Sequence, residues 1–508
     1  MDTKFRYFSS RLLDLIKSNG FFIFVILLFV FESVWIALSA LYPQAFDENF
    51  HFGLIKVYSH YWLPFLSKQP PNANAYGAVA RDPSYLYHYL MSFPYRFLAI
   101  FIHSQTSQVI SLRLIDIALF TAGLLLFKKV LTRVGLSHAL SNIILLLFIL
   151  IPIVPQLAAQ VTYDDLLFPI VACVCLLAFN LIDEIKIHKP RFKTLMLLLT
   201  ICISTSLVKY ALLPIFMSIV LFLLVFIYLT YNHKYKQFWK SLVNDFKAQS
   251  IWVRSGLPIL LTIALVLFIQ RDGWNLIEYH SIEPNCDKVL SVKSCSAYSP
   301  WYVDYIWHKN LVAGLTSVNK NIFVYTGYWF YWMWYRLFFA VNGAASGFYN
   351  NPPLPLPSIA AVLVAVLALS TTLRWYSKIF KYNTYILLLL TISACYLTAL
   401  FVKGYYSYTY TSYFENMNGR YLIPVLLPLA AFGALGIRRL LRHSETKKLI
   451  MTLVIVFLFL EGGGLLTFIV NGDSTWYWPN TTVNRVNKIS HKILDHIVIK
   501  GKIQHKNN

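Results

Sequence analysis

The sequence predicts an all-α polytopic membrane protein, and three observations support this fold class. Apolar runs of about 17–22 residues recur along the chain, which is the length an α-helix needs to cross a bilayer. Only 13% of the residues are charged, against roughly 25% in soluble proteins, and the mean hydropathy is +0.57. No soluble domain of ordinary size fits between the runs.

Eleven of these runs are predicted to be membrane spans. The first, at about residues 21–41, is too long for the core of a signal peptide and shows no evident cleavage site, so we expect it to stay as an anchor. The others are expected at about 109–127, 140–153, 194–207, 210–228, 257–269, 359–373, 385–401 and 449–470, with one more between Asp165 and Asp183 and one between Pro424 and Arg438.

Basic residues cluster in short segments between the runs, which the positive-inside rule assigns to the cytoplasm. This clustering explains the net charge of +22 better than a nucleic-acid partner does, and we expect no such partner. The N-terminus is then inside, and eleven spans place the end of the last span outside. The basic tail after residue 484 opposes this, and one miscounted span at 86–102 or 325–339 would move the tail inside.

The first outer loop, about residues 42–107, is expected to hold helices that lie in the membrane interface. Its apolar pieces are interrupted and aromatic, and the longest contains Pro94 and Arg96. In a later outer segment, Cys286 and Cys295 are the only cysteines outside the apolar runs. We predict that they form a disulfide, which requires an oxidising compartment.

Two acidic pairs stand out. Asp47 and Glu48 directly follow the first span, with His51 close behind, and charge at the mouth of a membrane helix is costly unless a site uses it or water reaches it. Asp164 and Asp165 lie at the same face, at the start of the fourth span. Each pair has a plain alternative, which is to cap the helix that it begins.

Lys209 and Arg420 are predicted at this same outer face, with interfacial anchoring as the alternative for both. Carboxylates and cations together suit transfer from a lipid-phosphate donor. A carboxylate takes a proton from an acceptor hydroxyl, and the cations hold the phosphate that leaves. Near the outer end of the second span, Arg113 and Asp116 are expected to form a local ion pair with a snorkelling arginine. Glu461 is expected to serve helix packing.

Several segments resemble the GT-C membrane glycosyltransferases, most closely the protein O-mannosyltransferases, with the lipid A aminoarabinose transferases as relatives. The motifs are Phe46-Asp47-Glu48 with His51-Phe52-Gly53, Asp82-Pro83-Ser84-Tyr85-Leu86-Tyr87-His88-Tyr89-Leu90, Ser111-Leu112-Arg113-Leu114, Asp164-Asp165, Lys209-Tyr210 and Gly419-Arg420-Tyr421-Leu422-Ile423-Pro424. The resemblance covers about residues 21–229, and beyond them only the last motif. Asp82-Pro83 departs from the family's frequent Pro-Pro, and no large outer domain follows the spans.

The resemblance implies a GT-C type fold and an inverting transferase that moves a sugar from a polyprenyl- or dolichyl-phosphate donor to an acceptor hydroxyl. Asp47 would be the general base with Glu48 as its rival, and Asp164 or Asp165 would orient the acceptor or the base. The implied substrate-binding residues are His51, Arg81, Arg96, Lys209, Arg420 and Tyr421. No cofactor is firmly implied, and a divalent metal is allowed but not favoured.

On this interpretation, residues 1–272 are a catalytic transmembrane module, 273–356 an outer region with the disulfide, 357–471 the C-terminal transmembrane helices and 472–508 a tail. Membrane lipid and a lipid-linked donor are the expected partners, and the acceptor stays open between protein, lipid and glycan. We favour a bacterial inner membrane, with the ER membrane as the alternative.

Two other functions compete with a transferase. A transporter or flippase of lipid-linked saccharides would also be polytopic with buried charge, but it should show paired repeats and broken helices near the midplane. A non-catalytic assembly or signalling protein should tolerate changes of the outer carboxylates. We see no clear repeat, and the acidic residues lie at one face.

Overall fold

The computed structural model describes residues 3–44, 47–232, 234–338, 355–376, 383–414, 417–440, 445–460, 463–479, 482 and 485–493. Its regular structure is helical. The structure names no β-strand among these residues, and an isolated bridge joins Ala40 to Tyr477. The predicted all-α class is therefore confirmed.

Nine helical stretches in the described ranges are long and apolar enough to cross a membrane, so the chain is a multi-pass membrane protein. They are formed by α2 (Asn19–Ser39), α5 (Gln105–Arg133), α8 (Asp164–Lys186), η3 (Tyr210–Leu212) with α10 (Leu213–Thr230), α12 (Ile251–Phe268) with η4 (Ile269–Gly273) and α13 (Trp274–Tyr279), α18 (Pro355–Arg374), α20 (Thr384–Thr411), η6 (Gly419–Leu422) with α21 (Ile423–Leu440), and α22 (Glu445–Leu460) with α23 (Leu465–Asn471).

Two shorter apolar helices, α6 (His138–Ile149) and α9 (Phe192–Val208), coincide with the other two predicted spans. With 12 and 17 residues they are shorter than a typical span of about 20. A count of eleven spans therefore stays a prediction.

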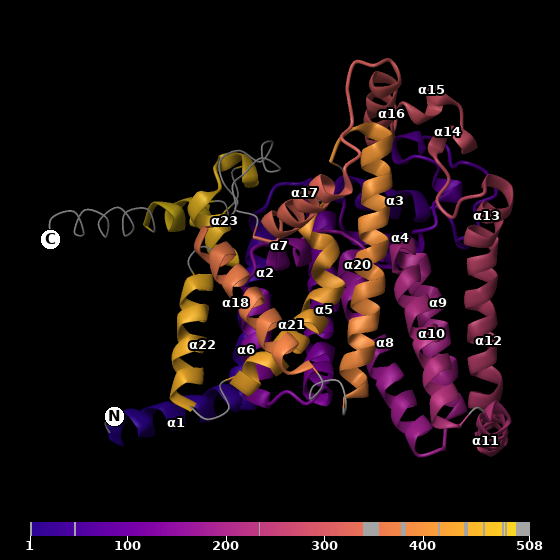
Figure 1. Cartoon of the computed structure of the whole chain (residues 1–508). Helices are drawn as coiled ribbons and strands as arrows, with labels where there is room; N and C mark the ends of the chain where they lie inside the picture. Colours follow the sequence, from indigo (N-terminus) through magenta and orange to yellow (C-terminus); the bar gives the residue numbers. More distant parts are fainter. Residues whose placement is uncertain are drawn as a thin grey trace.

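The long helices form one bundle, with short helices at both ends (Figure 1). At the lower end, α1 (Thr3–Lys17) and α11 (Tyr235–Ala248) lie across the bundle direction. Near the upper end are α3 (Glu48–Tyr58), α4 (Leu86–Phe101), α7 (Ile153–Ala158) and α17 (Ile322–Tyr335). Helices thus form in the first outer loop, as predicted, while their place in the membrane interface stays a prediction.

The core of the bundle is built where α5 meets α8. The rings of Phe120 and Phe168 stack with their centroids 4.2 Å apart. Gly123 permits this approach, because a Cβ atom there would lie 2.3 Å from the Phe168 ring. The contact fixes the start of α8, which carries Asp164 and Asp165, relative to α5.

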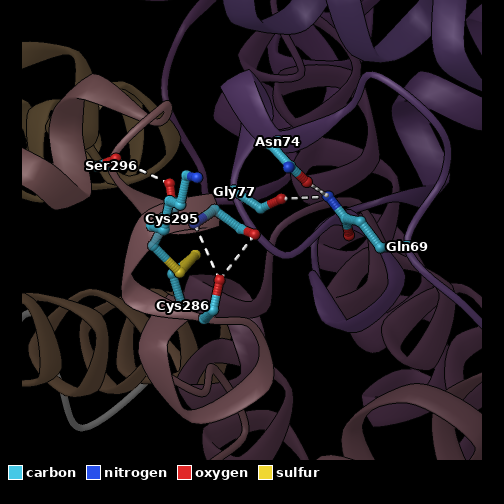
Figure 2. Close-up of a disulfide and its surroundings, with 9 residues drawn as sticks. Gln69, Asn74, Gly77, Cys286, Cys295 and Ser296 are labelled. Carbon is cyan, nitrogen blue, oxygen red and sulfur yellow. Dashed lines mark hydrogen bonds between the residues drawn. A yellow bond between two sulfur atoms is a disulfide. The ribbon is translucent and has the colours of Figure 1, made fainter.

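The outer segment contains α14 (Cys286–Val289), α15 (Val292–Cys295) and α16 (Ser299–Val312). The predicted disulfide between Cys286 and Cys295 is present, with Cα atoms 5.8 Å apart. Figure 2 shows it beside the first outer loop, where Gln69 donates hydrogen bonds to the Gly77 carbonyl (2.8 Å) and the Asn74 side chain (3.4 Å). Short turns shape this loop: η1 (Asn74–Tyr76) and η2 (Val79–Arg81).

Tyr298 holds the outer segment against this loop. Its ring covers Gly77, which has a φ of +75°, and a Cβ atom at Gly77 would lie 3.1 Å from the ring. On its other side, the Tyr298 ring packs 5.9 Å from the ring of Phe50 in α3. The outer segment therefore contacts the helix that follows Asp47.

The chain after α23 returns to the outer end of α2 through a short turn, η7 (Ser474–Trp476). The Leu41 amide donates to the Trp476 carbonyl (2.8 Å), and the Trp478 amide donates to the Ser39 carbonyl (3.0 Å). These residues lie at the same end of the bundle as Asp47. This is the side predicted for the end of the last span.

Candidate active site

Asp47 precedes α3 in a left-handed backbone conformation, with φ 69° and ψ 26°. Aspartate is among the few residues that adopt this region readily. Its side chain makes no helix-capping hydrogen bond and instead accepts one from the Arg420 guanidinium at 2.7 Å. The Arg420 side chain is only 5% exposed, whereas that of Asp47 is 51% exposed. Capping by Asp47 and snorkelling by Arg420 are therefore wrong.

A second ion pair joins Lys209 to Asp164, with Nζ 2.8 Å from Oδ1 and both side chains buried. Asp164 and Asp165 lie in the first turn of α8, where the helix dipole favours them, but neither carboxylate accepts a hydrogen bond from a helix amide, so capping by hydrogen bonds is wrong for both. The anchoring alternative for Lys209 is wrong as well, because its ammonium group is inside the protein. Lys209 follows the last turn of α9, which directs it toward the start of α8.

Two tyrosines connect these ion pairs. The Lys209 ammonium lies 4.4 Å from the ring centroid of Tyr163 and 4.8 Å from that of Tyr421. The Tyr421 hydroxyl accepts a hydrogen bond of 3.4 Å from Arg420. Four segments far apart in the sequence, at the starts of α3 and α8, the end of α9 and η6, thus meet in one site.

His51 and His88 form a buried pair beside this site. His51 Nδ1 and His88 Nε2 are 2.8 Å apart, and the His51 ring packs 4.5 Å from the ring of Tyr163. Burial lowers the pKa of His51 well below its usual value, and the charges of Arg420 and Lys209 add to this. Burial also lowers the pKa of His88 to about 3. Both rings are therefore neutral near pH 7.

Glu48 lies behind the site in a fully buried ion pair with Arg113. Both its oxygens accept from the guanidinium, at 2.7 Å each. Arg113 also donates to the carbonyls of Ala37 (3.0 Å) and Ala40 (2.8 Å), and the Val161 amide donates to Glu48 (3.1 Å). This arrangement joins α2, α3, α5 and the α7–α8 loop, and it occupies both oxygens of the predicted rival base.

The predicted local pair between Arg113 and Asp116 is wrong. Asp116 instead accepts a hydrogen bond of 2.7 Å from the Tyr87 hydroxyl in α4. Although Arg113 and Asp116 are about one turn apart on α5, Arg113 faces the start of α3 and pairs with Glu48 instead. Asp165 lies in this same buried layer, and neither of its oxygens has a hydrogen-bond partner among the described residues.

Arg81 and Arg96, predicted as substrate-binding residues, lie elsewhere in the described structure. Arg96 donates to the carbonyls of Ser59 (2.7 Å) and Tyr58 (2.9 Å), at the end of α3 remote from Asp47. Eleven residues of helix separate the two ends by about 15 Å. Arg81 pairs with Glu278 at 3.8 Å. No described contact joins either arginine to the two ion pairs.

Sequence reasoning did not select Tyr163 and His88 as site residues. Tyr163 directly precedes the acidic pair Asp164-Asp165, and that adjacency could have singled it out. His88 lies in a motif that was recognised, but nothing in one sequence indicates that it faces His51. Phe46 and Glu461, two residues of the sequence analysis, fall outside the described residues.

The two ion pairs balance to zero net charge, so the site contains two cations whose present partners are carboxylates. Such a site can exchange one anion for another. The described residues contain no group of three His, Cys, Asp or Glu side chains placed to hold a metal ion.

No protein-family model matches the chain, and no curated protein matches its sequence.

Proposed function

We propose that this chain is an inverting glycosyltransferase that moves a sugar from a polyprenyl- or dolichyl-phosphate donor to an acceptor hydroxyl. The observation that carries the proposal is the meeting of Asp47 with Arg420, beside Lys209 and Asp164, at one end of a membrane bundle. The ordered resemblance to GT-C enzymes adds support. The site residues, the GT-C assignment and a bacterial inner membrane belong to this proposal.

In the reaction, the acceptor oxygen bonds to the anomeric carbon of the sugar on the face opposite the phosphate. The bond between that carbon and the phosphate oxygen breaks, and its electron pair leaves with the lipid phosphate. Asp47 takes the proton of the acceptor hydroxyl. Arg420 and Lys209 stabilise the negative charge that develops on the phosphate.

Donor binding has to disturb the ion pairs, because both cations already have carboxylate partners. Asp47 is the partner that can leave, since its side chain is half-exposed whereas Asp164 is buried. The donor phosphate then takes the place of Asp47 on Arg420. The released carboxylate is available as the base only once the donor is bound.

Glu48 and Asp165 have other roles in this proposal. Glu48 is held by Arg113 and supports the start of α3. Neither oxygen of Asp165 has a hydrogen-bond partner among the described residues, and burial of an unpaired charge is costly, so we assign it the protonated form. Asp164 keeps Lys209 in place between the Tyr163 and Tyr421 rings.

The test is transfer of radiolabelled sugar from a crude pool of lipid-linked donors in membranes that contain the wild-type chain or a variant. We expect a labelled product with wild type that is lost in Asp47→Asn at equal expression, while Asp287→Asn, an exposed carboxylate near the disulfide, stays active. Full activity of Asp47→Asn would remove Asp47 as the base. If wild type forms no product but moves labelled lipid across the membrane, the chain is a transporter.

A further inference from the structure

The end of the bundle opposite the site carries a second distinctive surface. Helix α8 begins at Asp164 in the site and ends at Lys186, about 33 Å away for 23 residues. At this lower end, α11 lies across the ends of α9, α10 and α12, and Figure 1 shows it along its own axis.

Helix α11 has a buried face and an exposed apolar stripe. Phe238 and Leu242 pack into the main core of the bundle. Tyr235, Trp239 and Val243 follow one another at four-residue spacing, so they share one side of the helix, and each is exposed. At the start of α12, Trp252 is also exposed, by 85%. Exposed aromatic residues at the ends of membrane helices are typical of the lipid headgroup region.

A row of lysines runs beside this stripe. Lys236, Lys240 and Lys247 occupy one side of α11, directly next to Tyr235, Trp239 and Val243, and all three are exposed. Further exposed lysines at this end of the bundle are Lys186, Lys189, Lys193 and Lys234. We call α11 with these seven lysines the lysine platform.

The carboxylates near the platform are occupied by other groups. Asp183 pairs with Arg133, Glu184 accepts from the Thr194 hydroxyl, and Asp245 accepts from the Phe192 amide. Within the described residues, no carboxylate forms an ion pair with any of the seven platform lysines. The platform therefore presents unbalanced positive charge next to aromatic side chains.

We propose that the lysine platform binds the headgroups of anionic phospholipids. The apolar stripe enters the part of the acyl region nearest the headgroups, while the lysines reach the phosphates at the membrane surface. Charge selects the ligand, since a zwitterionic headgroup cannot neutralise the platform and each lysine near an anionic surface strengthens binding about fivefold. The inference does not depend on the proposed transferase activity, because the platform lies at the other end of the bundle.

The test uses the full chain, purified in a neutral detergent, and follows its thermal unfolding during titration with phosphatidylglycerol, phosphatidylcholine or inorganic phosphate. We expect phosphatidylglycerol alone to raise the unfolding temperature. The variant Lys236→Gln/Lys240→Gln/Lys247→Gln should need at least tenfold more phosphatidylglycerol for the same rise. The matched control Lys288→Gln/Lys293→Gln/Lys309→Gln removes three exposed lysines of the outer segment and should behave as wild type.

Three results would overturn the proposal: an unchanged titration in the platform variant, an equal loss in the control variant, or an equal rise with phosphatidylcholine or inorganic phosphate. If the triple variant does not fold, native mass spectrometry of the wild-type chain decides. Bound phosphatidylglycerol should then be lost in high salt, and bound lipid that resists salt contradicts a headgroup site built from lysines.

Discussion

Asp47 is a residue whose conformation allows a clean substitution. Its left-handed backbone suits asparagine equally well, so Asp47→Asn removes the charge without straining the start of α3. We expect transfer to fall at least a hundredfold, as for loss of a general base. We also expect the released lipid phosphate to bind several times more tightly, because no carboxylate competes for Arg420. Transfer assays and binding of a fluorescent polyprenyl phosphate measure the two effects.

The transfer assay tests Asp47 as the base, and the binding assay tests the exchange of anions on Arg420. Loss of transfer with unchanged or weaker phosphate binding would leave Asp47 as the base and reject the exchange of anions on Arg420. Arg420→Gln provides the opposite control, since it should weaken phosphate binding. A variant of Asp47 that keeps full activity would contradict the proposed reaction itself.

Because His51 and His88 are buried, we expect the stability of the fold to fall in acid. Their pKa values lie below the value of about 6.5 expected in the unfolded chain, so below that pH the unfolded state binds protons that the folded state does not. The contribution of each histidine to the free energy of unfolding should be constant above pH 7 and fall by up to about 1.4 kcal/mol per pH unit below pH 6. Chemical unfolding in detergent between pH 4.5 and 8 measures this slope.

The matched controls for this slope are His88→Gln and His60→Gln. Replacing the buried His88 should reduce the pH dependence, whereas replacing His60, which is exposed, should leave it as in wild type. Equal slopes in all three proteins would show that the buried pair is not responsible.

At the scale of elements, the buried ion pair of Glu48 and Arg113 fixes the orientation of α3 relative to the end of α2. Removing one partner leaves an uncompensated buried charge, so Glu48→Gln should lower the free energy of unfolding by about 3–5 kcal/mol. Asp14→Asn breaks an exposed pair with Lys17 and should cost at most about 1 kcal/mol. Unfolding in denaturant checks both values, and equal losses would contradict a structural role for Glu48.

The disulfide is expected to hold the outer segment against the first outer loop. Its ring spans nine residues of sequence, for which chain entropy gives about 2.5 kcal/mol. Cys286→Ser/Cys295→Ser should therefore speed proteolysis of the outer segment while the membrane helices stay protected. Limited trypsin digestion followed by mass spectrometry locates the cuts, and unchanged protection of residues 280–312 would contradict this prediction.

The helical elements could be predicted from the sequence because a membrane span is a local property, since about 20 apolar residues define it without reference to any partner. The ion pairs within the site could not be predicted in this way. Asp47 and Arg420 are 373 positions apart, and a single sequence contains no signal that joins them. The predicted partner of Arg113 was wrong for the same reason: its nearest acidic neighbour on the helix is Asp116, but its partner in the structure is Glu48, 65 positions away.

At the scale of the whole molecule, the site and the lysine platform should lie on opposite sides of the membrane. In cells, a membrane-impermeant maleimide should label Lys288→Cys directly and Lys236→Cys only after permeabilisation, since the positive-inside rule places the platform in the cytoplasm. The wild-type chain is the background control, because its cysteines are either paired in the disulfide or at least partly buried. Direct labelling of both variants would contradict the arrangement.

The electrical neutrality of the paired site has a consequence for turnover. The proposed donor is a phosphate diester with one negative charge, whereas the lipid phosphate left as product would carry between one and two, so the cations would hold the product more firmly than the donor. In the proposed cycle Asp47 counters this, because once it has passed the acceptor's proton to water its carboxylate can return to Arg420 and displace the phosphate. Re-formation of the ion pair at the start of α3 would then drive release of the product after each turnover.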